Sequence, residues 1–199
     1  MSTKSHWENI YTTKTPNDVS WTEAKPSVSL DLIEQCGASQ DASIIDIGGG
    51  DSLLIDHLLK LGYTNVSVLD ISAAAIKRAK ARLGNEADRV TWIVSDITEF
   101  EPKQSYDVWH DRAVFHFLTE VSDIDNYKKL VTSYAKNITL GTFSTNGPVK
   151  CSGLEITQYD EQKIRETFCP PFNLIECFNK DHITPFNTVQ NFTFSRLII

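Results

Sequence analysis

The sequence is poor in several features that would point to other classes of protein. It contains four cysteines, and they lie far apart without a Cys-x-x-Cys motif: Cys36, Cys151, Cys169 and Cys177. We therefore expect free thiols in a reducing compartment and no metal site. The N-terminal residues 1–7 contain no apolar signal region, and no window is long or apolar enough to span a bilayer. These absences favour a cytoplasmic protein.

Positive charge is also scarce. Nineteen Lys and Arg residues face 26 Asp and Glu residues, which gives a net charge of -7. Nucleic acids and anionic membranes bind clustered Lys and Arg, so we expect neither as a partner. No repeat, low-complexity segment or linker divides the chain. We predict a single domain over residues 1–199, with a lid-like arm at 1–27, a core at 40–145 and a substrate-side part at 146–199.

Glycine is sparse too, but three of the nine glycines stand together at Gly48–Gly50. An apolar run at 43–47 leads into them, and a segment that is apolar on most of one helix face follows at 52–61. This pattern predicts a buried strand, a tight turn and a helix. Glycines leave main-chain N–H groups open to a ligand, and the helix N-terminus behind them favours negative charge. The pattern is typical of a turn that binds a nucleotide-like ligand.

Strands and helices alternate along most of the chain. We predict strands at 43–48, 65–71, 89–96, 106–110 and 139–144, and helices at 28–36, 52–61, 73–83, 123–137 and 161–168. Two late strands, at 172–179 and 188–198, are expected to form an antiparallel pair. The order predicts an α/β fold with a Rossmann-like, doubly wound sheet of seven strands, mostly parallel and with an antiparallel last strand.

Three of the predicted strands end in an acid, at Asp46, Asp70 and Asp96. Ligands of doubly wound sheets bind at the carboxyl ends of the strands. Asp70 lies 20 residues after Gly50, a spacing at which an acid accepts hydrogen bonds from ribose hydroxyls. Asp96, with Ile97 beside it, is placed to meet an adenine. The three acids together are a stronger signal than the glycines alone.

Two common nucleotide motifs are not met. In a G-x-G-x-x-G pattern the third glycine would stand at position 53, which is leucine, and no Gly-Lys-Ser/Thr of a P-loop is present. A ligand with adenine and ribose but no pyrophosphate needs fewer glycines. The motif Asp46-x-Gly48-x-Gly50, with Asp70 and Asp96, resembles that of the class I S-adenosylmethionine (SAM)-dependent methyltransferases. Ser52 stands where many members keep another glycine.

This resemblance implies SAM as the cofactor and a role for each motif residue. The glycine backbone would pass under the methionine and the sugar, Asp46 would hold the turn and reach the amino group, and Asp70 would bind the ribose. Ile71 and Ile97 would lie against the two faces of the adenine, and Asp96 would accept from its amino group. The predicted cofactor-binding residues are Trp7, Tyr11, Trp21, Asp46, Gly48, Gly49, Gly50, Asp70, Ile71, Ser72, Asp96, Ile97 and Asp111.

A narrower resemblance involves the arm and the segment 106–112. Trp7 and Tyr11, followed by Trp21, look like the N-terminal W-x-x-x-Y…W arm of a subgroup of these enzymes, some of which methylate protein lysines. It implies that the three rings flank the methionine part of the cofactor as a roof. It also implies that Asp111 faces the pocket.

Methyl transfer is an in-line displacement, so a base is needed only if the acceptor must lose a proton. We predict His110 and Asp111 as catalytic residues. His116 stands among apolar residues, where a histidine is more often part of the core, and His182 is placed to reach the pocket mouth. We expect methyl transfer from SAM to a small-molecule acceptor. Alternatives are a protein lysine N-methyltransferase, an NAD(P)-dependent oxidoreductase and a non-catalytic SAM-binding protein.

Overall fold

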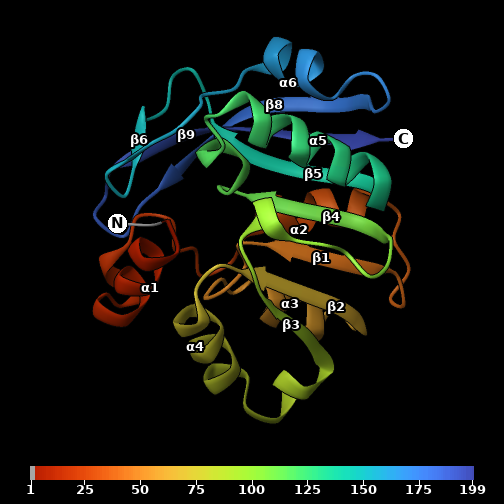
Figure 1. Ribbon diagram of the computed structural model, residues 1–199. Coiled ribbons are helices and arrows are strands. Elements are labelled where there is room, and N and C mark those ends of the chain that lie inside the picture. Colours follow the sequence, from red (N-terminus) through yellow and green to blue (C-terminus); the bar gives the residue numbers. More distant parts are fainter. Residues whose placement is uncertain (1–2) are drawn as a thin grey trace.

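The computed structural model describes residues 3–199, and a seven-stranded sheet runs through its centre (Figure 1). The strand order is β3-β2-β1-β4-β5-β9-β8. Strands β1 to β5 are parallel, and β9 runs antiparallel to both of its neighbours. The predicted fold class is thereby confirmed. The strands are β1 Ser43–Ile47, β2 Asn65–Asp70, β3 Val90–Val94, β4 Tyr106–Arg112, β5 Ala135–Phe143, β8 Asn173–Ile183 and β9 Val189–Ile198.

Helices cover both faces of this sheet (Figure 1). α2 and α3 pack on one face, and α5 and α6 pack on the other. The α-helices are α1 Thr3–Thr13, α2 Ser27–Gln35, α3 Leu54–Lys60, α4 Ala73–Leu83, α5 Val121–Tyr134 and α6 Glu161–Phe168. Short 3-10 helices (η1 Pro16–Asp18, η2 Gly84–Arg89, η3 Ile97–Glu99, η4 Phe115–Phe117) and the small β6–β7 pair (Lys150–Cys151, Leu154–Glu155) complete the elements.

The central strand β1 is buried on both faces, as its continuous apolar sequence requires. Ile44 packs in the cluster beneath α2 and α3, whereas Ile45 and Ile47 pack in the cluster beneath α5 and α6. The alternation leaves Asp46 on the α2 side of the sheet, directly paired with His110 in the register of β1 and β4. The parallel register therefore brings these two polar side chains together.

Local signals fix the helices beside the glycine turn. Ser72 is the N-cap of α4, and its hydroxyl accepts a hydrogen bond from Ala75 N at 3.2 Å, as its position before an alanine-rich run predicts. Gly62, just after α3, has a φ of +90°, a value that favours glycine. Both residues hold the turns that connect the first strands of the sheet.

Several element boundaries differ from the prediction, two of them by several residues. The helix predicted at 123–137 ends at Tyr134, and the chain passes directly into β5 at Ala135. Residues 135–137 pair with β4, with Tyr106 opposite Ala135, so the ladder of the sheet outweighs the helical tendency of Ala and Lys. Strand β8 is also longer than predicted and reaches Ile183.

The N-terminal arm lies across the end of the sheet where the parallel strands finish. α1 packs against α4, and Figure 1 shows it beside α4 and away from the C-terminus. The long β8–β9 hairpin reaches toward the same end. In the described part of the chain, no helix combines the length and apolar character that a membrane crossing needs.

Candidate active site

The glycine turn after β1 is shaped by the side chains that surround it. Gly48 has a φ of +69°, and a Cβ there would lie 2.1 Å from Cγ2 of Val114. At Gly50, a Cβ would lie 2.4 Å from Oδ2 of Asp70 and 2.6 Å from Cβ of Ala75. These approaches are too close for a side chain to fit unless its neighbours shift, so both positions favour glycine, and Gly48 lines the cavity.

Asp70 is the buried acid at the end of β2. Its carboxylate accepts hydrogen bonds from Gly50 N at 3.0 Å and Ser72 N at 2.8 Å. Burial raises the pKa of Asp70 to about 7, although these two bonds act in the opposite direction. Asp70 therefore stands against the glycine turn as an acceptor whose charge a ligand with hydroxyl donors would stabilise.

Asp46 and His110 form a second buried polar group on the floor of the site. His110 Nδ1 donates to Asp46 Oδ1 across 2.7 Å, and His110 Nε2 lies 2.9 Å from Ser29 Oγ in α2. Both ring nitrogens of His110 are thus engaged. Asp46 Oδ2 is buried and has no partner among the described residues. A ligand with an N–H donor would satisfy this oxygen.

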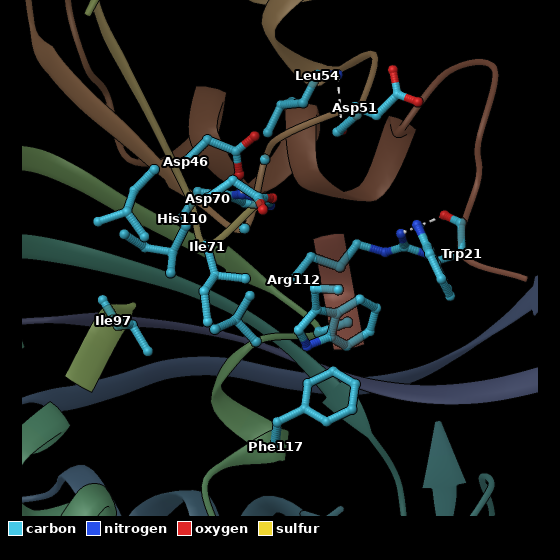
Figure 2. Close-up of a pocket in the computed structure, with 18 of the residues that line it drawn as sticks. Trp21, Asp46, Asp51, Leu54, Asp70, Ile71, Ile97, His110, Arg112 and Phe117 are labelled. Carbon is cyan, nitrogen blue, oxygen red and sulfur yellow. Dashed lines mark hydrogen bonds and ion pairs between the residues drawn. The ribbon is translucent and has the colours of Figure 1, made fainter. Parts of the chain in front are cut away.

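Four aromatic rings of the arm and of η4 pack over this floor. The Trp7 centroid lies 5.7 Å from that of Trp21 and 5.2 Å from that of Phe117, and Tyr11 lies 6.3 Å from Trp21. Roof and floor enclose a cavity of about 300 Å³. Figure 2 shows Trp21 and Phe117 on one side of it and Asp46 and Asp70 on the other.

Polar contacts hold the arm down at both ends. On the α4 side, Glu8 accepts from Ser72 Oγ at 2.7 Å and from Ala74 N at 3.3 Å. On the hairpin side, Arg112 donates to the Trp21 carbonyl at 3.0 Å and to Glu23 at 3.1 Å. The arm is therefore tied to both halves of the sheet, across the ends of the strands.

His182 of the β8–β9 hairpin takes part in the same contacts. Its Nε2 donates to the Ser20 carbonyl at 2.6 Å, and its Nδ1 lies 3.0 Å from Glu23 Oε1. His182 does not line the cavity. Its contacts join the β8–β9 hairpin to the arm at Ser20 and Glu23.

Most of the predicted site residues lie around one cavity. Those that line it are Trp7, Tyr11, Trp21, Asp46, Gly48, Gly49, Asp70, Ile71, Asp96, Ile97 and His110. Gly50 and Ser72 stand behind this surface, where their N–H groups bind Asp70. Asp96 also caps η3, because its Oδ1 accepts from Thr98 N at 3.0 Å.

Asp111 lies elsewhere, contrary to the prediction that it faces the pocket. It is fully buried on the α5 side of the sheet, where Tyr127 donates to its Oδ2 at 2.7 Å and Val114 N donates to its Oδ1 at 3.0 Å. Neighbouring residues of a strand point to opposite faces, so His110 and Asp111 cannot both face the cavity. Burial raises the pKa of Asp111 to about 6, and the carboxyl supports the turn after β4.

His116 belongs to the core, which was the simpler of its two interpretations. Its Nδ1 accepts a hydrogen bond from Phe143 N at 3.1 Å. Burial, with the charge of Arg112, lowers the pKa of His116 to about 3, so the ring is neutral. His116 does not line the cavity.

Several lining residues were missed by the sequence interpretation, among them Ser29, Arg112, Val114, Phe117 and Cys151. Arg112 had a detectable signal, since it stands two residues after His110 on the same face of one strand. The others come from α2, from η4 and its approach, and from β6. Only the folded chain brings them together.

Comparison with known proteins gives matches over this region. Residues 45–136 match the family described as "Methyltransferase domain". Malonyl-[acyl-carrier protein] O-methyltransferase 1 of Ilyobacter polytropus is 24% identical over 146 residues, which is 73% of this chain and 54% of that protein. Mouse EEF1A lysine methyltransferase 2 is 24% identical over 94 residues, 43% of this chain and 38% of its own length.

A solved structure shares the whole fold. It is a 1,6-didemethyltoxoflavin-N1-methyltransferase of Burkholderia thailandensis with bound 1,6-didemethyltoxoflavin and S-adenosylhomocysteine. Its TM-score is 0.71 at 14% identity, over 98% of this chain and 86% of the other. This likeness concerns the fold. The chain spans about half the length, or less, of the curated relatives it matches.

Proposed function

We propose that the chain is a class I SAM-dependent methyltransferase, as the match of residues 45–136 to a methyltransferase domain supports, and that it transfers a methyl group from SAM to a small-molecule acceptor. One observation carries the proposal: the glycine turn, Asp46, Asp70 and Asp96 surround a single cavity beneath an aromatic roof. A dinucleotide would call for a further glycine at position 53, where the chain has leucine.

The residues present fit this cofactor. We assign the ribose hydroxyls to Asp70, whose carboxylate gains from new donors, and the amino group to the unpartnered oxygen of Asp46. Asp96, Ile71 and Ile97 would hold the adenine. SAM supplies a methyl group already activated on a sulfonium, so the chain's task is to orient the two reactants and exclude water.

Neither predicted catalytic residue is proposed as a base. Both nitrogens of His110 are committed to Asp46 and Ser29, and Asp111 faces α5. We propose instead that His110 is a positioning residue that fixes the carboxylate of Asp46 beneath the glycine turn. The reaction then depends on an acceptor that attacks without help from a base.

A small acceptor is favoured by the size of the cavity. A cavity of about 300 Å³ is at the lower end of the range for small-ligand pockets, roughly 300–1,000 Å³. A protein lysine would need an open channel between the roof and the strands. A protein lysine acceptor is nevertheless included in the test, because one relative is a lysine methyltransferase and the net charge of this chain is -7. We expect no nucleic acid or membrane partner and a cytoplasmic location.

A methyl-transfer assay with isotopically labelled SAM tests this function. The purified chain is offered a panel of small metabolites and, separately, a cell lysate, with Asp70→Ala as the inactive control. We expect label in small products and none in protein. Label in a protein band that Asp70→Ala abolishes would support the lysine alternative, and no transfer despite SAM binding would support a non-catalytic binding protein.

A further inference from the structure

One corner of the cavity is mainly aromatic and apolar. It consists of Trp7, Trp21, Glu23, Arg112, Phe117 and Cys151, which all line the cavity. Among these described residues, the charged ones are Arg112 and Glu23, which bind each other. Trp21 and Phe117 pack with Cys151 around one apolar cluster, and Figure 2 shows Arg112, Trp21 and Phe117 together. Its surface is aromatic and apolar around the guanidinium.

The corner adjoins the cofactor floor. A Cβ on Gly48 would touch Val114, so the turn that follows Arg112 lies directly against the glycine turn. An acceptor in the corner would thus lie next to a ligand that rests on that turn. The corner is therefore the part of the cavity that remains for the methyl acceptor once the floor is assigned.

Arg112 still has donors to offer. Its Nη1 and Nη2 bind the Trp21 carbonyl and Glu23, but its Nε is buried and has no partner among the described residues. A guanidinium has five N–H donors arranged as a planar fork that matches a carboxylate. A buried charged donor without a partner is costly, and an anionic oxygen would remove that cost.

The carboxylate of Glu23, which binds Arg112, is also bound by a second residue. Burial acts to raise the pKa of Glu23, but the hydrogen bond from His182 and the charge of Arg112 outweigh it, so the pKa is lowered and the carboxylate is ionised. His182 faces this carboxylate with Nδ1 and the Ser20 carbonyl with Nε2. Arg112 and His182 therefore share the carboxylate of Glu23, and the charge of Asp46 also acts on Arg112.

Among the described residues beside the corner, no base is free of a partner: the carboxylate of Glu23 is bound by Arg112 and His182. The thiol of Cys151 is neutral, because burial raises its pKa to about 12. The nitrogens of His110 are committed, and His116 and His182 do not line the cavity. An acceptor that must first lose a proton, such as an alcohol or a protonated amine, would find no group here to take it.

We propose that the acceptor is a small carboxylate, that Arg112 holds it beneath Trp7 and Phe117, and that the product is its methyl ester. This inference rests on the proposed function. A carboxylate oxygen forms the new C–O bond while the S–CH₃ bond breaks and its electron pair stays on sulfur. The anion and the sulfonium cancel each other's charge, and no proton moves. Arg112 then acts through charge and orientation.

The test compares matched acceptors. Acetate, malonate, succinate and benzoate are assayed beside ethylamine, benzylamine, phenol and thiophenol with labelled SAM, and esters are identified by mass spectrometry. We expect methyl esters from one or more acids. At saturating SAM the rate should be flat from about pH 6 to 9, because carboxyls of ordinary pKa are already ionised there. An amine, phenol or thiol product with a rate that rises with pH would overturn the inference and keep the methyltransferase.

Two variants separate acceptor binding from the hold on the arm. Arg112→Gln is expected to raise KM for the acid at least about tenfold, as for a lost charge-assisted bond, with the Kd for S-adenosylhomocysteine within about twofold. Glu23→Gln removes the partner of Arg112 but keeps the guanidinium, and should change the acid KM much less. Equal losses of cofactor affinity in both variants would mean that Arg112 only holds the roof.

Direct binding gives a readout that needs no turnover. With S-adenosylhomocysteine present, the preferred acid should raise the melting temperature of the wild-type protein further, and should not do so for Arg112→Gln. If the cofactor product stabilises the protein but none of the four acids adds stability or yields an ester, the inference fails. If S-adenosylhomocysteine itself does not bind, the proposed function fails first.

Discussion

Asp70 links the burial of one carboxyl to ligand binding. In the unliganded protein its pKa is raised to about 7, chiefly by burial. Ribose hydroxyls donate hydrogen bonds and therefore favour the ionised carboxylate, so binding requires loss of the Asp70 proton below that pH. We predict that the affinity for S-adenosylhomocysteine rises as the pH increases from about 6 to about 8 and is level above that. Titration calorimetry at several pH values measures it.

A variant of Asp96, a second acid that lines the cavity, is the control for this pH dependence. Asp96→Asn alters the adenine end of the site and leaves Asp70 in place, so the pH dependence should persist at a lower affinity. Asp70→Asn should remove it. An unchanged pH profile in Asp70→Asn would contradict the assignment of Asp70.

Gly50 supports Asp70 from the other side. An alanine there would place its Cβ 2.4 Å from Asp70 Oδ2 and 2.6 Å from Ala75. We expect Gly50→Ala to displace the carboxylate, to destabilise the protein by about 1–3 kcal/mol, and to weaken S-adenosylhomocysteine binding at least about tenfold. Calorimetry and thermal unfolding measure the two effects.

Gly37→Ala is the matched control. Nothing lies within 4 Å of a Cβ at Gly37, although its φ of +66° disfavours alanine. This variant should lose stability and keep its ligand affinity. If both variants lost affinity equally, the effect would reflect general destabilisation and not the glycine turn.

The sequence predicted the acids near the ends of β1, β2 and β3 better than the residues at the end of β4. Asp46 and Asp70 lie at the carboxyl ends of β1 and β2, and Asp96 follows β3 by two residues. Parallel strands bring such ends to one edge. For His110 and Asp111, the sequence predicted a strand end but did not show which of the two side chains points into the cavity. Alternation allows only one of them into the cavity, and the long-range pairing of His110 with Asp46 decides which one.

At the scale of elements, the N-terminal arm covers the cavity and is bound to the sheet side of the site by hydrogen bonds. Glu8 ties α1 to the N-terminus of α4 through Ser72 and Ala74. Glu8→Ala removes both bonds, so we expect S-adenosylhomocysteine to dissociate about tenfold faster, since each net hydrogen bond contributes about 1 kcal/mol. Stopped-flow displacement measures the rate, and hydrogen exchange of residues 3–13 should rise with it.

Glu166→Ala is the control for the arm. Glu166 is exposed on α6, where it accepts a bond from Gln162, far along the chain from α1. The Glu166→Ala variant should leave the dissociation rate of S-adenosylhomocysteine unchanged. A Glu8→Ala protein with faster exchange in α1 but unaltered ligand release would show that the arm does not gate the cavity.

Some element boundaries are determined by tertiary contacts and not by local sequence signals. The Ser72 cap and the Gly62 turn were readable because each acts within a few residues. The change from α5 to β5 at Ala135 was not readable, because it depends on pairing with Tyr106. The same holds for His182, whose bond to Ser20 spans 162 residues.

At the scale of the whole molecule, the site lies between the strand ends of the sheet and the N-terminal arm. The alternation of strands and helices predicted the sheet and the antiparallel last strand, since these depend on patterns within each segment. The way in which the C-terminal hairpin and α4 both hold the N-terminal arm depends on contacts between distant segments. That closure turns a row of strand ends into an enclosed cavity.

The central claim is that this cavity binds an adenosyl-methionine ligand and not a dinucleotide. Thermal unfolding of the purified chain with S-adenosylhomocysteine, and separately with NAD⁺ and NADH, tests it most directly. We predict stabilisation by S-adenosylhomocysteine alone, of about 2.7 kcal/mol at a hundredfold excess over Kd, and loss of that shift in Asp70→Ala. Stabilisation by NAD⁺ or NADH without any response to S-adenosylhomocysteine would contradict it.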